Sequence, residues 1–224
     1  MFPWVSVWLS PRSTIRQVVS ENPCRALWWL ASIYGFSSLL NAFQSMMLGD
    51  MIPVLGILIL AALLSPLMGY VFFSIWSAAI SFTGKWLKGQ GTYVQVRAAY
   101  AWSCVPLLLN IPLWLILAFF FGRSFFANFA ETHLLTQSEV SLLFLVLILR
   151  ITAAIWSLVL YINMLAEVQS FSILRSIGNI LLSTILVSVV FLLIGLGISA
   201  LVHGTPEPAK SVFQFFQDNS LRYL

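Results

Sequence analysis

Five long apolar stretches, separated by short turns that are basic or marked by glycine and proline, run from about residue 26 to residue 201. At bilayer depth they hold a single formal charge, Arg150. A backbone in hydrocarbon must satisfy its own hydrogen bonds, so apolar stretches of about 19 residues or more are typical of membrane-spanning helices rather than buried strands. The sequence therefore predicts an all-α, polytopic membrane protein.

Composition leads to the same class. With 60% hydrophobic and 8% charged residues, the 224-residue chain has too little polar surface to cover a soluble domain. The net charge of +4 is not gathered into a basic cluster that could follow a phosphate backbone, which argues against nucleic acid as a partner. The solvent for most of the chain is expected to be the lipid bilayer.

One of the apolar stretches is too long for a single upright span. The expected spans cover residues 26–48, 51–84, 98–121, 141–165 and 173–201. The second has 34 residues, which is about 50 Å of helix against roughly 30 Å of hydrocarbon. Because Pro66 removes one helical hydrogen bond, it is the natural place for this helix to bend. We expect a bundle of five helices whose second stretch is kinked or broken near Pro66.

Basic residues set the expected orientation, because Lys and Arg are enriched on the cytoplasmic side of membrane proteins. With five spans and a cytoplasmic N-terminus, seven basic residues lie inside and three outside, whereas splitting the second stretch gives six against four. We therefore expect a cytoplasmic juxtamembrane segment at 1–25, a five-helix transmembrane domain at 26–202 and an external tail at 203–224. The tail has helical spacing typical of an interfacial helix.

A short amphipathic helix is predicted before the first span, at residues 11–21. Ile15 and Val18 fall on one face, and Arg12 and Arg16 on another. We expect it to act as a juxtamembrane anchor on the membrane surface. The alternative is specific recognition of anionic headgroups, for which two arginines are a small cluster.

The turn at residues 84–93 is rich in glycine and lysine. It lacks the Gly-Lys-Ser/Thr ending and the preceding strand of a phosphate-binding loop. A simpler interpretation is that Thr92 and Gln95 form a capping box, while Gly89 and Gly91 permit the chain reversal. Two lysines and an aromatic residue are expected at headgroup level, namely Lys85, Lys88 and Trp86.

Several short motifs along the chain, taken in order, carry a resemblance to one known family. They are Ser65-Pro66-Leu67, Gly84-Lys85, Gly89-Gln90-Gly91-Thr92-Tyr93, Ala99-Tyr100-Ala101-Trp102-Ser103 with Pro106, and the turn at 165–172. Their order and spacing resemble the Yip (Ypt-interacting protein) family, over about residues 2–202 and with the same number of spans.

The resemblance implies an integral membrane protein that is not an enzyme and carries no cofactor. Eukaryotic members associate with Ypt/Rab GTPases, with other family members and with the trafficking machinery of early secretory membranes. Only about 25 residues precede the first span here, in place of the long N-terminal segment of those members, so a GTPase partner is in doubt. The short form is similar to prokaryotic members, which implies a location in the bacterial inner membrane.

Arg150 is the strongest single-residue clue within the spans, because a charge near the bilayer centre costs about 2.5 kcal/mol or more unless it finds partners. Asn110 lies at a compatible depth and Asn41 nearer the outer face. Two interpretations stay open. The cluster is either a hydrogen-bonded clamp between helices or a polar site for the passage of an ion, a proton or a headgroup.

The second candidate site is an interaction surface on the cytoplasmic turns. Its residues are Lys85, Trp86, Lys88, Gly89, Gly91, Thr92, Glu167 and Gln169. Glu167 is expected to pair with Arg175 across the last turn. The spans contain no catalytic set and no metal cluster, so we expect a membrane-organising or protein-interaction factor. Its expected partners are anionic headgroups, a second copy or another membrane protein, and the alternative is a small transporter or channel component that uses Arg150.

Overall fold

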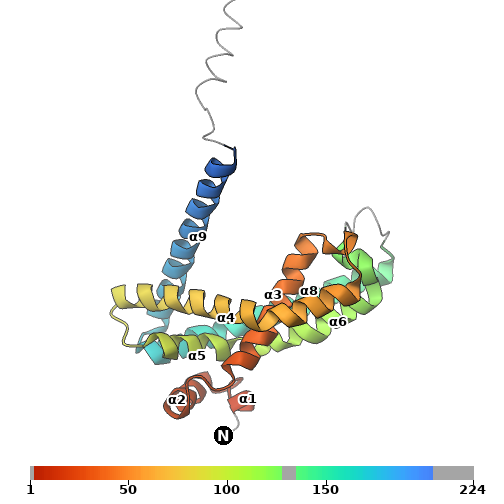
Figure 1. Cartoon of the computed structure of the whole chain (residues 1–224). Coiled ribbons are helices and arrows are strands. Elements are labelled where there is room, and N and C mark those ends of the chain that lie inside the picture. Colours follow the sequence, from red (N-terminus) through yellow and green to blue (C-terminus); the bar gives the residue numbers. More distant parts are fainter. Residues whose placement is uncertain (1–2, 128–134, 204–224) are drawn as a thin grey trace, which may run out of the picture. The chain divides into compact units, whose positions relative to one another are not determined.

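The computed structural model describes residues 3–127 and 135–203, and every regular element in these ranges is a helix (Figure 1). The predicted all-α class is therefore confirmed. In chain order the elements are α1 Pro3–Ser6, α2 Pro11–Glu21, α3 Leu27–Ser45, η1 Leu48–Asp50, α4 Val54–Trp86, α5 Tyr93–Ser103, η2 Val105–Leu109, α6 Asn110–Phe121, η3 Gly122–Phe126, α8 Gln137–Gln169 and α9 Ile173–His203. The chain divides into two compact units, Met1–Ser183 and Thr184–Leu224. The tail helix predicted beyond α9 lies outside the described residues.

Four helices of the described chain are long and apolar enough to cross a membrane: Val54–Trp86, Val105–Phe126, Gln137–Gln169 and Ile173–Leu201. This is one fewer than the five predicted. The first predicted span corresponds to α3, which has 19 residues. Its serines together with Asn41 and Gln44 make it too polar to qualify by composition. The other four agree with a multi-pass membrane protein.

α4 is one continuous helix through Pro66, so of the predicted kink or break the break is wrong. Proline has no N–H, which leaves the carbonyl of Ala62 without its usual donor four residues on. The Ser65 hydroxyl donates a hydrogen bond to that carbonyl at 2.9 Å. Side-chain hydroxyls that replace the missing donor are one reason why membrane helices tolerate proline.

The predicted third span, in contrast, is not one continuous helix, because α5 ends at Ser103 and η2 follows. Around Pro106 the backbone tightens, and the Leu107 amide bonds to the Cys104 carbonyl (2.9 Å) rather than to that of Ser103. The Ser103 carbonyl accepts a hydrogen bond from the Ser157 hydroxyl of α8 at 2.8 Å. The break is thus paired across helices, as irregular backbone at membrane depth requires.

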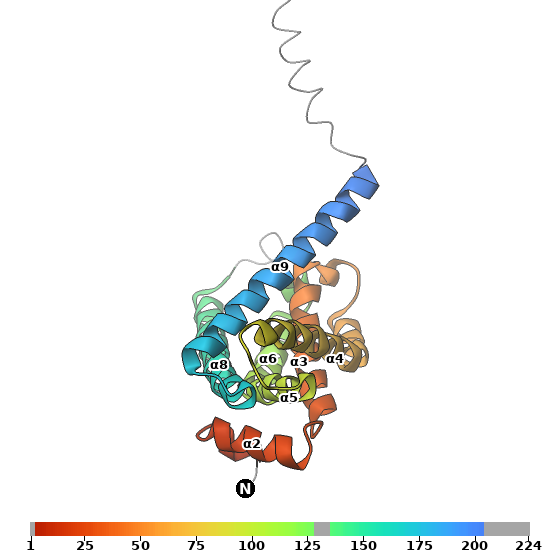
Figure 2. The same cartoon turned by 90° about the vertical axis from the view of Figure 1, so that its left-hand side faces the viewer.

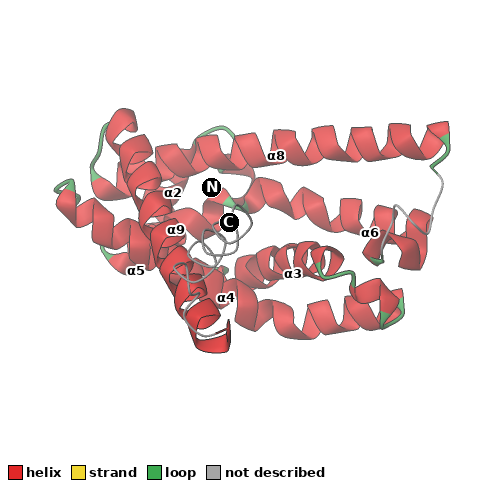
Figure 3. Ribbon diagram, turned by 90° about the horizontal axis from the view of Figure 1, so that it is seen from above, coloured by secondary structure: helices red, strands yellow, loops and turns green. Residues whose placement is uncertain are grey.

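α3 and α4 pack with their backbones almost in contact (Figure 3). A Cβ on Gly35 would meet the Ser65 carbonyl oxygen, and a Cβ on Gly69 would meet the Ala31 carbonyl oxygen. All four residues are buried. Small residues at a crossing are typical of membrane bundles, where van der Waals contact between closely approaching backbones drives association.

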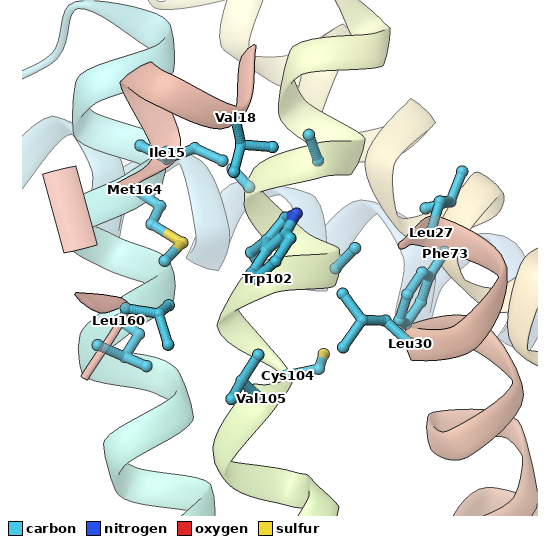
Figure 4. Close-up of a cluster of buried hydrophobic side chains, with 14 of the residues drawn as sticks. Ile15, Val18, Leu27, Leu30, Phe73, Trp102, Cys104, Val105, Leu160 and Met164 are labelled. Carbon is cyan, nitrogen blue, oxygen red and sulfur yellow. The ribbon is translucent and has the colours of Figure 1, made fainter. Parts of the chain in front are cut away.

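α2 forms where the amphipathic helix is predicted, but protein rather than lipid covers its apolar face. It packs against α5 and α8 (Figure 2). Ile15 and Val18 are 0% exposed and lie in one buried cluster with Trp102 and Met164 (Figure 4). The apolar face of α2 is therefore covered by the bundle, and its side chains complete the core.

α3 packs along the first part of α4 and does not reach the turn at residues 84–93 (Figure 1), because Trp28 at its beginning stacks on Tyr70, sixteen residues before the end of α4. Near its beginning, Leu27 and Leu30 belong to the buried cluster that includes Ile15 of α2. Near its end, the Gln44 side chain donates a hydrogen bond to the Phe125 carbonyl in η3 at 3.3 Å. α4 then runs back past the beginning of α3 to the turn at residues 84–93.

Candidate functional site

Two turns that are far apart in sequence meet at one end of the bundle, at the left in Figure 1. Residues 84–93 join α4 to α5, and residues 165–172 join α8 to α9. Gln169 lies where they touch and is 1% exposed. Its Oε1 accepts a hydrogen bond from the Gly91 amide (3.1 Å), and its backbone carbonyl accepts one from the Gln90 amide (3.2 Å). The surface formed by these two ranges is termed the turn face.

The glycines of the turn face are required by space rather than by backbone conformation. Neither Gly89 nor Gly91 has a positive φ, and the left-handed residue of the turn is Lys88, with φ of 64°. A Cβ on Gly89 would overlap the Gln169 side chain, and a Cβ on Gly91 would lie 2.9 Å from the Val168 carbonyl. The prediction that these glycines permit the reversal is corrected, because they instead let the two turns approach.

The amides of the turn are occupied by protein acceptors. Gly89 bonds to the Gly84 carbonyl (2.8 Å), Gln90 and Gly91 bond to Gln169, and Thr92 bonds to the Gln95 side chain (2.9 Å). A phosphate-binding loop needs such N–H groups free, so residues 89–92 do not form one. The last of these bonds belongs to a capping box between Thr92 and Gln95, as predicted.

A cleft of about 570 Å³ opens beside the turn, between the end of α4 and the start of α5. Its lining includes Ser81, Phe82 and Lys85 from α4 and residues 89–93. Lys85 is exposed, whereas Ser81 is 8% exposed and its hydroxyl oxygen is buried, with no hydrogen-bond partner among the described residues. Lys85 is the cation among the residues that line the cleft.

A buried cation lies beneath the turn face. Arg97 is 9% exposed and donates a hydrogen bond to the Tyr70 hydroxyl at 3.0 Å. Its guanidinium also lies 5.1 Å from the centre of the Tyr93 ring. Burial lowers the pKa of Arg97. Hydrogen bonding to Tyr70 and Tyr93 and the electrostatic interaction with both side chains raise the pKa by more, so the net shift is upward. The spacing of Tyr93 and Arg97, four residues apart on one helix, is the sequence signal that would have indicated this contact.

The predicted pair of Glu167 and Arg175 is wrong. Among the described residues Glu167 forms its ion pair with Arg16 of α2, at 2.6 Å. Burial of the apolar face of α2 brings Arg16 to this position. The neighbouring residue Arg12 donates a hydrogen bond to the Asn163 side chain at 3.3 Å. Arg175 is exposed beside the second turn. The pair is therefore a contact between α2 and α8, and it leaves Arg175 available at the surface.

The start of α9 is fastened to α4 by buried polar side chains that sequence reasoning missed. The Thr83 hydroxyl bonds to Asn179 Oδ1 at 2.6 Å and also contacts the Ser183 hydroxyl. Asn179 Nδ2 donates to the Ile80 carbonyl at 3.3 Å. All three side chains are 0% exposed. Polar side chains are common between membrane helices, but only the paired helices reveal which of them meet.

Arg150 on α8 contacts one of its two predicted neighbours. Its Nη2 donates to Asn41 Oδ1 at 3.5 Å, and its guanidinium lies 4.5 Å from the centre of the Trp114 ring. Asn110 makes no hydrogen bond to Arg150 in the described residues, and its Oδ1 is buried without a partner. Trp114 was not predicted as a partner, although it follows Asn110 by one helical turn. These contacts join α8 to α3 and α6.

The chemistry available at the turn face is that of binding. Trp86 is 58% exposed, and Lys85 and Lys88 are exposed beside it. In the ranges 3–127 and 135–203, no group of three or more His, Cys, Asp and Glu side chains could hold a metal ion.

The family model described as the Yip1 domain matches residues 5–196. The match begins within α1, ends within the last third of α9 and includes both turns of the turn face. No curated protein and no solved structure matches the chain.

Proposed function

The chain belongs to the Yip1 domain family, and on that premise we propose that it is a non-enzymatic, multi-pass membrane protein that binds a membrane partner through its turn face. The observation that carries the proposal is the contact of the two turns at Gln169. It holds exposed cationic and aromatic side chains on a fixed base, which lowers the ordering cost of binding. The match to the Yip1 domain family also supports a wider role in membrane organisation.

We further propose five crossings with the N-terminus and the turn face in the cytoplasm and the C-terminus outside. The packing of α3 along α4, from the Trp28–Tyr70 stack to the Gln44 contact with η3, supports this count. Composition alone does not identify α3 as a crossing. α2 pairs with α8 beside the turn face, so α2 and the turn face lie at the same end of the bundle. The excess of basic residues on this end favours the cytoplasm, and the prokaryotic form favours the bacterial inner membrane.

The transporter alternative has less support. It draws on the prolines of the second and third stretches and on Arg150. α4 is continuous through Pro66, and the break around Pro106 is paired to α8 by the Ser157 hydroxyl. Arg150 has Asn41 and Trp114 as partners, which suits a clamp between helices. Purified protein in liposomes is therefore expected to show no solute flux. Flux that disappears on Arg150→Leu would favour the transporter instead.

Site-specific photo-crosslinking tests the proposal in cells. A photoreactive residue at Gln90, on the turn face, is expected to form adducts with a membrane protein, because its side chain is exposed. The same residue at Gln137, at the opposite end of α8, is the control. Adducts at Gln90 should weaken when Lys85→Glu and Lys88→Glu are combined. Equal adducts at both positions, or none at Gln90, would contradict a binding role for the turn face.

A further inference from the structure

The cleft beside the turn has an uncompensated positive charge. Lys85 forms no ion pair in the described part of the chain, and no acidic residue is in the cleft lining. Glu167, the acidic residue of the turn face, is paired with Arg16. Arg97 adds a second positive charge behind the Tyr93 ring. The cleft is therefore suited to an anion.

Unpaired hydrogen-bond donors accompany this charge. The capping box uses the amides of Thr92 and Gln95, which leaves the first-turn amides of α5, at Tyr93 and Val94, outside the helical hydrogen bonds. The positive end of a helix favours a negative group at such amides. Ser81 also lines the cleft, but its hydroxyl oxygen is buried in the wall and does not open onto it.

The cleft also has an apolar side, which a free anion would not need. Ala78 and Phe82 line it together with Lys85, at positions separated by four and three residues along α4. Phe82 is 51% exposed, and its ring packs edge-on against Trp86, with 5.0 Å between ring centres. Residues at this spacing form one face of a helix. The apolar surface of α4 thus leads from the lipid side up to the ammonium group of Lys85.

We propose that this cleft binds one anionic glycerophospholipid. The lipid phosphate lies near Lys85 and the start of α5, and an acyl chain follows Ala78 and Phe82. This inference rests on the proposed function, because it requires the turn face to lie at headgroup level. It assigns the turn face a lipid ligand in addition to its protein partner.

Native mass spectrometry of the full chain in detergent tests the site, with phosphatidylglycerol and phosphatidylcholine of identical acyl chains as probes. Lys85→Gln is compared with Lys88→Gln, because both remove one positive charge from the same turn but Lys88 is not in the cleft lining. The wild type is expected to prefer phosphatidylglycerol. Lys85→Gln should weaken that preference about fivefold, and Lys88→Gln should leave it nearly unchanged. Equal losses in the two variants would mean diffuse attraction by surface charge and would overturn the site.

Two further outcomes separate the alternatives. Soluble glycerol phosphate is expected not to displace phosphatidylglycerol at equal concentration, whereas full displacement would mean a site for a free phosphate and not for a lipid. Thermal unfolding of both variants in lipid-free detergent controls for misfolding. Should the photo-crosslinks at Gln90 fail while the lipid preference persists, the lipid site stands without the protein partner. If the photo-crosslinks form but the lipid preference does not depend on Lys85, the lipid site is overturned and the protein partner stands.

Discussion

At the scale of single residues, Gln169 holds the two turns together through an acceptor that an apolar side chain cannot replace. Gln169→Met keeps a similar volume but leaves the Gly91 amide without its partner. A buried amide that loses its acceptor costs about 1–3 kcal/mol. Gln169 Nε2 has no partner among the described residues, so its loss removes no hydrogen bond. We expect a lower free energy of unfolding, measured by thermal denaturation in detergent.

Gln90→Met is the matched control for this prediction. The Gln90 side chain is exposed, and its turn contact is made by the backbone, so this variant should unfold at the wild-type temperature. If both variants are as stable as the wild type, the side-chain contact of Gln169 does not hold the turns together.

At the scale of elements, the crossing of α3 and α4 depends on the absence of a side chain at Gly69. A Cβ there would meet the Ala31 backbone, which cannot move aside as a flexible side chain would. Gly69→Ala should therefore destabilise the protein by about 1–3 kcal/mol, as overpacking does. Gly56→Ala on the same helix is the control, because its nearest neighbour would be the Pro53 ring at 3.8 Å. There alanine should be neutral or stabilising by up to about 1 kcal/mol. Equal unfolding temperatures for the two variants would contradict a tight crossing.

The continuity of α4 through Pro66 supplies a second prediction at this scale. Ser65→Ala should destabilise α4, since it removes the hydroxyl that bonds to the Ala62 carbonyl. In the presence of Pro66→Ala the same change should cost much less, because the restored amide supplies the missing donor. A double-mutant cycle measures this difference as a coupling of about 0.5–3 kcal/mol. Additive effects would show that the hydroxyl does not compensate for the proline.

At the scale of the whole molecule, local patterns predicted what depends on neighbouring residues. The all-α class, the amphipathic helix and the capping box at Thr92 follow from periodicity, apolar length and residue spacing. What faces each helix depends on contacts between distant segments. Burial of Ile15 by α8, the pairing of Glu167 with Arg16 and the rescue of Pro66 by Ser65 therefore needed the fold. For the same reason the explanation of the turn glycines by backbone conformation was wrong.

The number of membrane crossings depends on α3: the chain crosses five times if α3 spans the membrane and four times if it does not. If α3 crosses the membrane, α2 and the turn face lie on one side, as the Arg16–Glu167 contact requires. Native Cys24, which is exposed just after α2, then reports the side of α2 once Cys104 is replaced by alanine. Gln90→Cys and Gln137→Cys, each in a background without Cys24 and Cys104, report the two ends of α8.

With an impermeant thiol reagent, we expect Cys24 and Gln90→Cys to be protected in intact cells and labelled after lysis. Gln137→Cys should be labelled from outside. Four crossings would place Cys24 on the side opposite to Gln90→Cys. That result would also be incompatible with the packing of α2 on α8, because the membrane would separate Arg16 from Glu167. A single labelling pattern thus tests both the crossing of α3 and the position of α2 within the bundle.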